Sequence, residues 1–246
     1  MIKFFRKIRQ QLLSENKFSK YLLYAIGEIF LVVIGILIAL QINNCNEERK
    51  LKQQQKVVLK ALYTDFVANK KLIQEGIEKH RYHKDLGLTW IKLLRKDTLN
   101  VQKNPFLDSL LFWGPEYKVI DFIDASLNNV INSEKLDLVN NTKLKQGLIE
   151  YPLSINKYKD LETVVRSIVI ERIRPRGEQY ISLSEMLDGS DSFKSDYTGL
   201  LNDRQLSNDY VNRHWQLDDL LKDLKNLEAK TDTLIILIDK ELKNEF

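Results

Sequence analysis

The sequence predicts an all-α protein in which a single transmembrane helix leads into an elongated antiparallel helical bundle. Residues 21–42 are almost entirely apolar, and the apolar residues beyond them recur at helical spacing. Runs of alternating β-branched residues bounded by turn residues are almost absent. We therefore expect three parts: an amphipathic arm at 1–20, a transmembrane helix at 21–42 and a helical domain at 43–246.

The arm at 1–20 is basic, with six Lys and Arg residues against one acid and a net charge of +5. Residues 43–246 carry no net charge, so the basic character of the chain does not indicate a nucleic-acid surface. "MIKFFRKIRQQLL" places apolar residues at helical spacing among cations, which is typical of a helix at a membrane surface; a plain solvated arm is the alternative. The expected headgroup contacts are Lys3, Arg6, Lys7 and Arg9.

The apolar stretch is long enough to cross a membrane. Residues 21–40 contain one charged residue, Glu28, and twenty residues at helical rise cover about 30 Å, the thickness of a hydrocarbon core. A buried helix of a soluble protein rarely stays apolar all round, as residues 29–40 do. A signal peptide has a shorter apolar region of about 7–15 residues and a small-x-small cleavage site. We therefore expect an uncleaved anchor.

Positive charge flanks this anchor on both sides, with six Lys and Arg residues before it and five in residues 43–60. The slight excess at the N-terminus favours a cytoplasmic arm, and a long domain can cross the membrane regardless of its charge. The domain is therefore expected outside the cytoplasm. The one cysteine, Cys45, permits no disulfide within the chain and is neutral on the compartment.

Glu28 is costly in hydrocarbon unless it is neutralised, paired or turned toward a protein neighbour. Glu28, Leu31, Gly35 and Ala39 share one helix face, and Gly35-x-x-x-Ala39 allows another helix to approach closely. This face is the candidate interface for self-association or for another membrane protein. The alternative is that Glu28, about 10 Å below Tyr21, reaches the headgroups.

Beyond the membrane we expect a stalk helix at about 43–80, continuous with the span. Its apolar stripe is Val58, Leu62, Phe66, Ile73 and Ile77. The pattern weakens after "HRYHKD", returns at Leu86 and stops at "KDTLNVQKNP". Short helical pieces should follow, separated by Pro105, Gly114 and Pro115.

Ser133 and Thr142 are the expected N-caps of the next helices. The helix after Thr142 should be bent or interrupted near Pro152 and end at "RPRG", residues 174–177. "LDGSDSFKSDYTG" is a turn-rich connector. The last helix, at about 203–243, has an apolar stripe formed by Val211, Trp215, Leu217, Leu221, Leu224, Leu227, Leu234 and Ile238.

Few residues indicate chemistry. His80 and His83 are spaced for one helix face, and His214 would join them as a metal ligand if the last helix lay alongside, but ordinary surface histidines are favoured. The sequence has no Gly-rich phosphate loop, nucleophile elbow, HExxH or CxxC. We therefore expect no catalytic residue and no cofactor. The tryptophans are expected in the core or at an interface: Trp90, Trp113 and Trp215.

The stretch "KFFRKIRQQLLSENKFSKYLLYAIGEIFLVVIGILIALQINN", followed by "NEERK", resembles the N-terminal signature of a family of single-span membrane proteins of Bacteroidota, the domain-of-unknown-function family numbered six thousand and ninety. "LDLVNNTKLKQGLIEY" and "TDTLIILIDKEL" resemble its middle and end. Gly27, Glu28 and Gly35 match the family pattern, whereas Cys45 stands where Trp is usual. The resemblance implies an inner-membrane protein with a helical domain, but no activity.

Three functions remain open. The first is a membrane-anchored helical interaction or sensing module without catalysis, whose partners are membrane lipid, a second copy of the chain through the transmembrane helix, or another protein. The second is a single-span energy-coupling subunit of the stator type that uses Glu28. The third is a metal-dependent membrane enzyme, for which the histidines are the only indication. Nucleic acid is not an expected partner.

Overall fold

The protein is described by a computed structural model that covers residues 18–94, 107, 110, 116–188 and 193–245. All regular structure in these ranges is helical, so the predicted all-α class is confirmed. The chain divides into two compact units, Met1–Gln54 and Gln55–Phe246. Some residues singled out in the sequence lie outside the described ranges: Lys3, Arg6, Lys7, Arg9, Pro105, Trp113, Gly114 and Pro115.

Helix α2 (Phe18–Leu93) contains the predicted span and the predicted stalk in one unbroken helix. It continues past residue 80, the expected end of the stalk. "HRYHKD" contains neither Pro nor Gly, and His80 is buried in the second unit, so nothing in this stretch favours a break. The helix ends just before "KDTLNVQKNP", where the apolar pattern stops.

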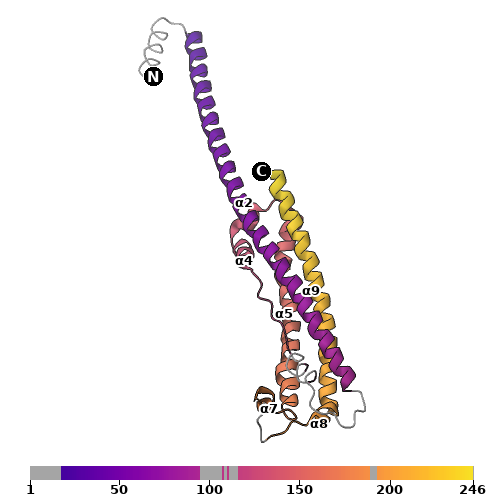
Figure 1. Ribbon diagram of the computed structural model, residues 1–246. Helices are drawn as coiled ribbons and strands as arrows, with labels where there is room; N and C mark the ends of the chain where they lie inside the picture. The colour runs from indigo at the N-terminus through magenta and orange to yellow at the C-terminus, as the bar shows by residue number, and fades with distance from the viewer. Residues whose placement is uncertain (1–17, 95–106, 108–109, 111–115, 189–192, 246) are drawn as a thin grey trace. The chain divides into compact units, whose positions relative to one another are not determined.

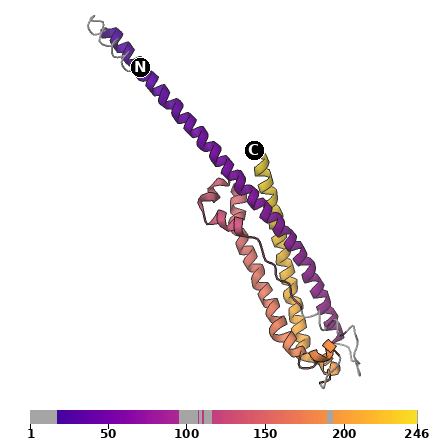
Figure 2. The same ribbon diagram turned by 60° about the vertical axis from the view of Figure 1, so that its left-hand side comes forward.

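The second unit contains two further long helices, α5 (Thr142–Ser167) and α9 (Arg204–Glu245). They lie beside the second half of α2 in both views (Figure 1, Figure 2). These three helices form the bundle that the apolar stripes predict. The short elements are α4 (Ala125–Ile131), η1 (Glu134–Leu138), η2 (Ile168–Ile173), α6 (Arg174–Gly177), α7 (Leu183–Asp188) and α8 (Tyr197–Leu201).

Helix α9 runs antiparallel to α2. The Gln55 side chain, near the start of the unit, donates to Glu241 near the end of α9 at 3.1 Å. Further along α2, Lys84 pairs with Asp218, which lies earlier in α9. The contacts between these two helices therefore advance in opposite directions.

Helix α5 is also antiparallel to α9, because Ser154 accepts from Lys230 at 2.7 Å and Lys157 pairs with Asp223 at 2.8 Å. Helices α2 and α5 therefore run in the same direction, which requires a return connection between them. Part of this connection is residues 116–124, which form neither helix nor strand and lie along the bundle (Figure 2). We call residues 116–124 the strap.

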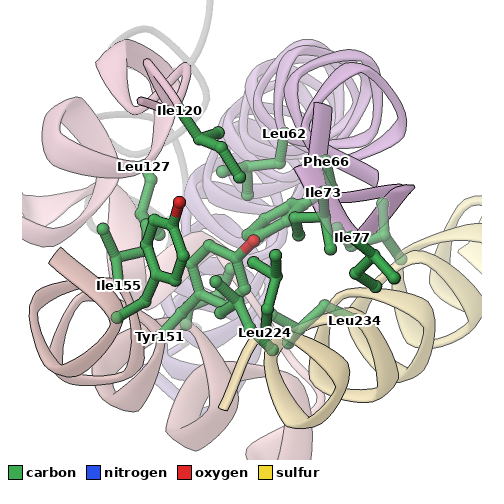
Figure 3. Packing of buried hydrophobic residues seen from close by; sticks show 14 of the residues in the cluster. Leu62, Phe66, Ile73, Ile77, Ile120, Leu127, Tyr151, Ile155, Leu224 and Leu234 are labelled. Atoms are coloured by element: carbon green, nitrogen blue, oxygen red, sulfur yellow. The ribbon is translucent and has the colours of Figure 1, made fainter. Parts of the chain in front are cut away.

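Apolar side chains from the three long helices and the strap meet at the centre of the unit (Figure 3). Phe66 of α2 packs edge-on against Tyr151 of α5, with ring centroids 4.9 Å apart. Ile120 of the strap and Leu224 of α9 complete the same core, and all four are buried. Burial of one such side chain contributes about 1.5–3 kcal/mol, so Ile120 anchors the strap in the core, whereas most other strap residues remain exposed.

The two expected N-caps differ in outcome. Ser133 is the N-cap of η1, where its side chain accepts from the Lys135 amide, as predicted. Thr142 is instead the first residue of α5, and the Asn141 side chain caps the helix by accepting from the Leu144 amide at 3.0 Å. Because Asn caps a helix at least as well as Thr, the cap lies one residue earlier than predicted.

Helix α5 contains Pro152 without a break, so the predicted interruption is wrong. Tyr151 and Ile155 on either side are buried in the core, and this packing offsets the backbone hydrogen bond that proline cannot make. After Ser167 the chain continues as the π-helix η2 and then as α6, which ends at Gly177. The end at "RPRG" is as predicted, whereas the π-helix was not predicted.

The two described tryptophans have different environments. Trp90 is fully buried, stacks on Tyr210 with ring centroids 5.5 Å apart, and donates from Nε1 to the Leu110 carbonyl at 3.1 Å. Trp215 is 63% exposed, so it does not belong to the core stripe predicted for the last helix. The buried members of that stripe are Leu217, Leu221, Leu224, Leu227, Leu234 and Ile238.

Candidate functional site: the membrane span and a buried polar network

One helix in the described part of the chain, α2, is long and apolar enough to cross a membrane. Its most apolar window has a mean hydropathy of 2.5, and no residue of that window is buried. The large apolar side chains from Leu22 to Ile42 are 44–77% exposed. Over this stretch the helix therefore presents apolar surface on all sides, as a helix surrounded by lipid does.

The four candidate interface residues of the span lie on α2 at the spacing of one helix face: Glu28, Leu31, Gly35 and Ala39. All four are at least partly exposed, and a Cβ added to Gly35 would meet nothing within 4 Å. This face therefore has room for the close approach of another helix.

A buried chain of hydrogen bonds links α2, α5 and the strap in the second unit. Nε2 of His80 lies 3.1 Å from the Tyr158 hydroxyl, and Tyr158 donates to Oε1 of Glu162 at 2.9 Å. The Ile120 amide donates to the same carboxylate oxygen at 3.0 Å. Each of these four residues is at most 8% exposed. We call them the polar network.

The direction of these bonds determines the tautomer of His80. Because Tyr158 uses its only proton toward Glu162, Nε2 of His80 must be the donor to the Tyr158 oxygen. Nδ1 then carries the lone pair, and it is buried without a hydrogen-bond partner. A second proton on His80 must therefore bind Nδ1, where no described residue accepts a hydrogen bond from it.

Cationic and titratable groups from three elements face His80. They are His83 on α2, Arg213 on α9 and Lys118 on the strap. Burial, followed by these three groups, lowers the pKa of His80 to about 4. His80 is therefore neutral near pH 7, and it is not the surface histidine that the sequence suggested.

The pKa of Glu162, the acidic residue of the polar network, is raised rather than lowered. Burial raises the pKa of Glu162, while the hydrogen bonds from Tyr158 and Ile120 lower it. Asp121 on the strap raises it further, and Lys159 on α5 lowers it. Burial and the neighbouring carboxylate raise the pKa of the Tyr158 hydroxyl well above its usual value. Tyr158 therefore stays protonated and bridges the two titratable groups.

Side chains of α2 hold the strap by its backbone and by its packing. Asn69 accepts from the Ile123 amide at 2.8 Å and donates to the Ile123 carbonyl at 2.7 Å. Gly76 allows Ile120 to lie directly on the helix, since a Cβ at Gly76 would overlap the Ile120 side chain. Two residues of the strap, Ile120 and Ile123, are thus held at defined positions along α2.

The first residues of the strap meet a cluster of arginines. Arg174 of α6 pairs with the Glu116 carboxylate at 2.8 Å, and Arg213 of α9 donates to the Glu116 carbonyl. The guanidinium carbons of Arg166 and Arg174 lie 5.6 and 5.9 Å from the centre of the Tyr117 ring, within the range of cation–π contacts. Burial lowers the pKa of Arg213 to about 10. Helices α5, α6 and α9 therefore hold the first residues of the strap.

The histidines do not converge on a metal site. His80 belongs to the polar network, His83 lies one turn further along α2, and Nε2 of His214 lies 3.7 Å from Asp218 on α9. Within the described ranges, no group of three or more His, Cys, Asp or Glu residues is placed to hold a metal ion. The geometry of these residues therefore does not favour metal-dependent chemistry.

The polar network and the strap were not predicted from the sequence. Tyr158 and Glu162 are spaced for one helix face, but many other pairs share that spacing. The usable signal was Arg213, which lies one turn before Leu217 on the apolar stripe of α9. An arginine is rarely fully buried without polar partners, so its place on that stripe indicates a polar region within the core.

Comparison with curated proteins and with solved structures finds no match for this chain. One family model matches it, over residues 28–105, which include most of the predicted span and the part of α2 that enters the bundle. That family is described as a family of unknown function, so the match supplies no activity. The predicted resemblance is confirmed: residues 28–105 of this chain match the family of unknown function DUF6090.

Proposed function

We propose that the chain is a membrane-anchored helical module for interaction or sensing, without catalysis of its own. One observation carries the proposal: from Leu22 to Ile42, α2 exposes large apolar side chains on all sides. A helix of about 20 predominantly apolar residues spans a hydrocarbon core of about 30 Å. The unit that follows has its own apolar core, so the anchor carries a folded unit.

The proposed location is the bacterial inner membrane, with the arm in the cytoplasm and the helical unit in the periplasm. The charge of +5 in residues 1–20 supports this orientation, because basic flanks stay in the cytoplasm. The same charge supports contact with anionic headgroups. The residues proposed for that contact are Lys3, Arg6, Lys7 and Arg9.

The proposed interface within the membrane is the face that contains Glu28, Leu31, Gly35 and Ala39, and its first proposed partner is a second copy of this helix. The open surface at Gly35 supports this, because small residues let helix backbones approach closely. Glu28 adds a polar group whose hydrogen bonding to a neighbouring helix is worth about 1–2 kcal/mol or less in a membrane.

A membrane two-hybrid assay of the span tests this interface. Gly35→Leu should lower association because the larger side chain prevents close approach, and Glu28→Leu should lower it because the polar contact is lost. Val33→Leu places the same side chain away from the interface face and should leave association unchanged. Equal association of all three variants and the wild type would contradict self-association through this face.

Energy coupling is the second candidate, and the observation that favours it is the single carboxylate of Glu28 in an otherwise apolar span. This function requires a multi-span partner, which mass spectrometry of complexes purified from native membranes would identify. Glu28→Gln should then abolish coupled activity at unchanged expression. In the interaction or sensing function, Glu28→Gln retains hydrogen bonding and should have little effect.

A further inference from the structure

The polar network lies where the strap, α2 and α5 meet, and it contains His80, which is 1% exposed and whose Nδ1 has no hydrogen-bond partner; the Nδ1 atoms of His83 and His214 also lack one, but those residues are only partly buried. The Ile120 amide of the strap and the Tyr158 hydroxyl donate to the same oxygen of Glu162, so the strap is bonded to the same carboxylate as the rest of the network. We infer that the polar network is a proton-responsive contact, which holds the strap on the bundle near neutral pH and releases it when His80 takes up a second proton.

Protonation of His80 is most unfavourable while the strap is in place. A proton on Nδ1 of His80 would be buried without an acceptor, and Lys118 of the strap and Arg213 of α9 would repel it. Glu162 would attract it, but it contacts His80 only through the Tyr158 hydroxyl. Release of the strap removes Lys118 and lets water reach the imidazole. Proton uptake and strap release therefore favour each other.

The size of the coupling follows from the two states of His80. Its pKa is about 4 with the strap in place and near the usual 6.5 when the imidazole meets water. By linkage, acidification from pH 7 to pH 5 shifts the equilibrium toward the released strap by about 20-fold. At pH 7 the neutral form dominates in both states, so the strap stays bound.

Two neighbours modify this response in opposite directions. Burial, followed by Arg213 and Lys79, also lowers the pKa of His83 to about 4. Neither of these cations lies on the strap, so release of the strap relieves the shift only in part, and protonation of His83 adds to release less than that of His80 does. Burial raises the pKa of Glu162, so acid favours its bound, protonated state and opposes release. Glu162→Gln removes this opposition while it keeps an oxygen for the Ile120 amide, and it should make the response to acid steeper.

Hydrogen–deuterium exchange of the full chain in detergent micelles measures the release directly. Protection factors, corrected for the intrinsic effect of pH on exchange, are compared for peptides from the strap and from α9. We expect strap protection to fall by about 20-fold between pH 7 and pH 5 relative to that of α9. An equal change in the two segments would overturn the inference.

His80→Gln is the test variant, because its side-chain amide can still donate to Tyr158 but does not titrate. Its strap protection should be independent of pH over this range, apart from the smaller contribution of His83. His214→Gln is the matched control, since His214 lies on α9 beside Asp218 and should retain the full response. A full response in His80→Gln would overturn the inference.

A measurement on the unmodified chain covers the case in which His80→Gln does not fold. Nitrogen-15 NMR of labelled histidine reports the tautomer and the titration of each ring. We expect one ring to be protonated at Nε2 alone at pH 7 and to titrate together with strap release. A His80 ring that titrates near 6.5 while the strap stays protected would overturn the inference.

Discussion

Single polar side chains determine where the strap lies. Apolar contacts such as that of Ile120 favour burial but do not fix one position of the strap along α2, whereas a hydrogen bond is directional and does. Asn69 is 1% exposed and pairs with both backbone groups of Ile123, so it sets the register of the strap on α2. Sequence alone could not reveal this, because the two residues are 54 positions apart and an isolated Asn in a helix has no distinctive pattern.

Asn69→Ala should therefore destabilise the second unit. The variant leaves the Ile123 amide and carbonyl without their partner, which costs about 1–3 kcal/mol because water reaches this part of the strap only in part. Urea denaturation of the full chain in detergent micelles measures the loss. Asn128→Ala replaces an exposed asparagine of α4 and should change stability by less than about 0.5 kcal/mol. Equal effects of the two substitutions would contradict the proposed role of Asn69.

At the scale of elements, α2 and α9 were largely predictable because each carries a long apolar pattern without proline. The prediction that Trp215 belongs to the apolar stripe of α9 was wrong, because Trp215 has the spacing of that stripe but faces solvent. The strap and η2 were not predictable, because both depend on neighbours distant in sequence. Glu116 of the strap, for example, is held by Arg174 and Arg213.

Polar pairing between α5 and α9 gives a test at this scale. The Tyr151 hydroxyl lies 2.9 Å from Thr231 Oγ1 inside the core, and burial raises the pKa of Tyr151 to about 12. Thr231→Val keeps the shape but leaves the buried hydroxyl without that partner, which should cost about 1–3 kcal/mol. Adding Tyr151→Phe should recover part of this loss, because an unpaired hydroxyl is no longer buried.

A double-mutant cycle by urea denaturation measures this coupling. The double variant should be more stable than the sum of the two single losses implies. Strict additivity would indicate that the hydroxyl pair contributes nothing to the contact between the two helices.

At the scale of the whole molecule, the two units share one helix, α2, and each proposed site includes a titratable residue of that helix. Glu28 lies in its exposed apolar part, and His80 lies in its buried part. The family match over residues 28–105 extends across both positions. These features together are consistent with the proposed function, a membrane-anchored module for interaction or sensing.

The orientation of the anchor is the central claim, and Cys45 allows it to be tested in the native sequence. Cys45 is the only cysteine, it is exposed, and it lies just beyond the predicted span. Ser14→Cys in a Cys45→Ser chain supplies the matched control on the cytoplasmic side. Both chains are treated in intact spheroplasts with a maleimide that cannot cross membranes. We predict that Cys45 is labelled without permeabilisation and that the control is labelled only after it. Labelling of Cys45 only after permeabilisation would contradict a periplasmic domain.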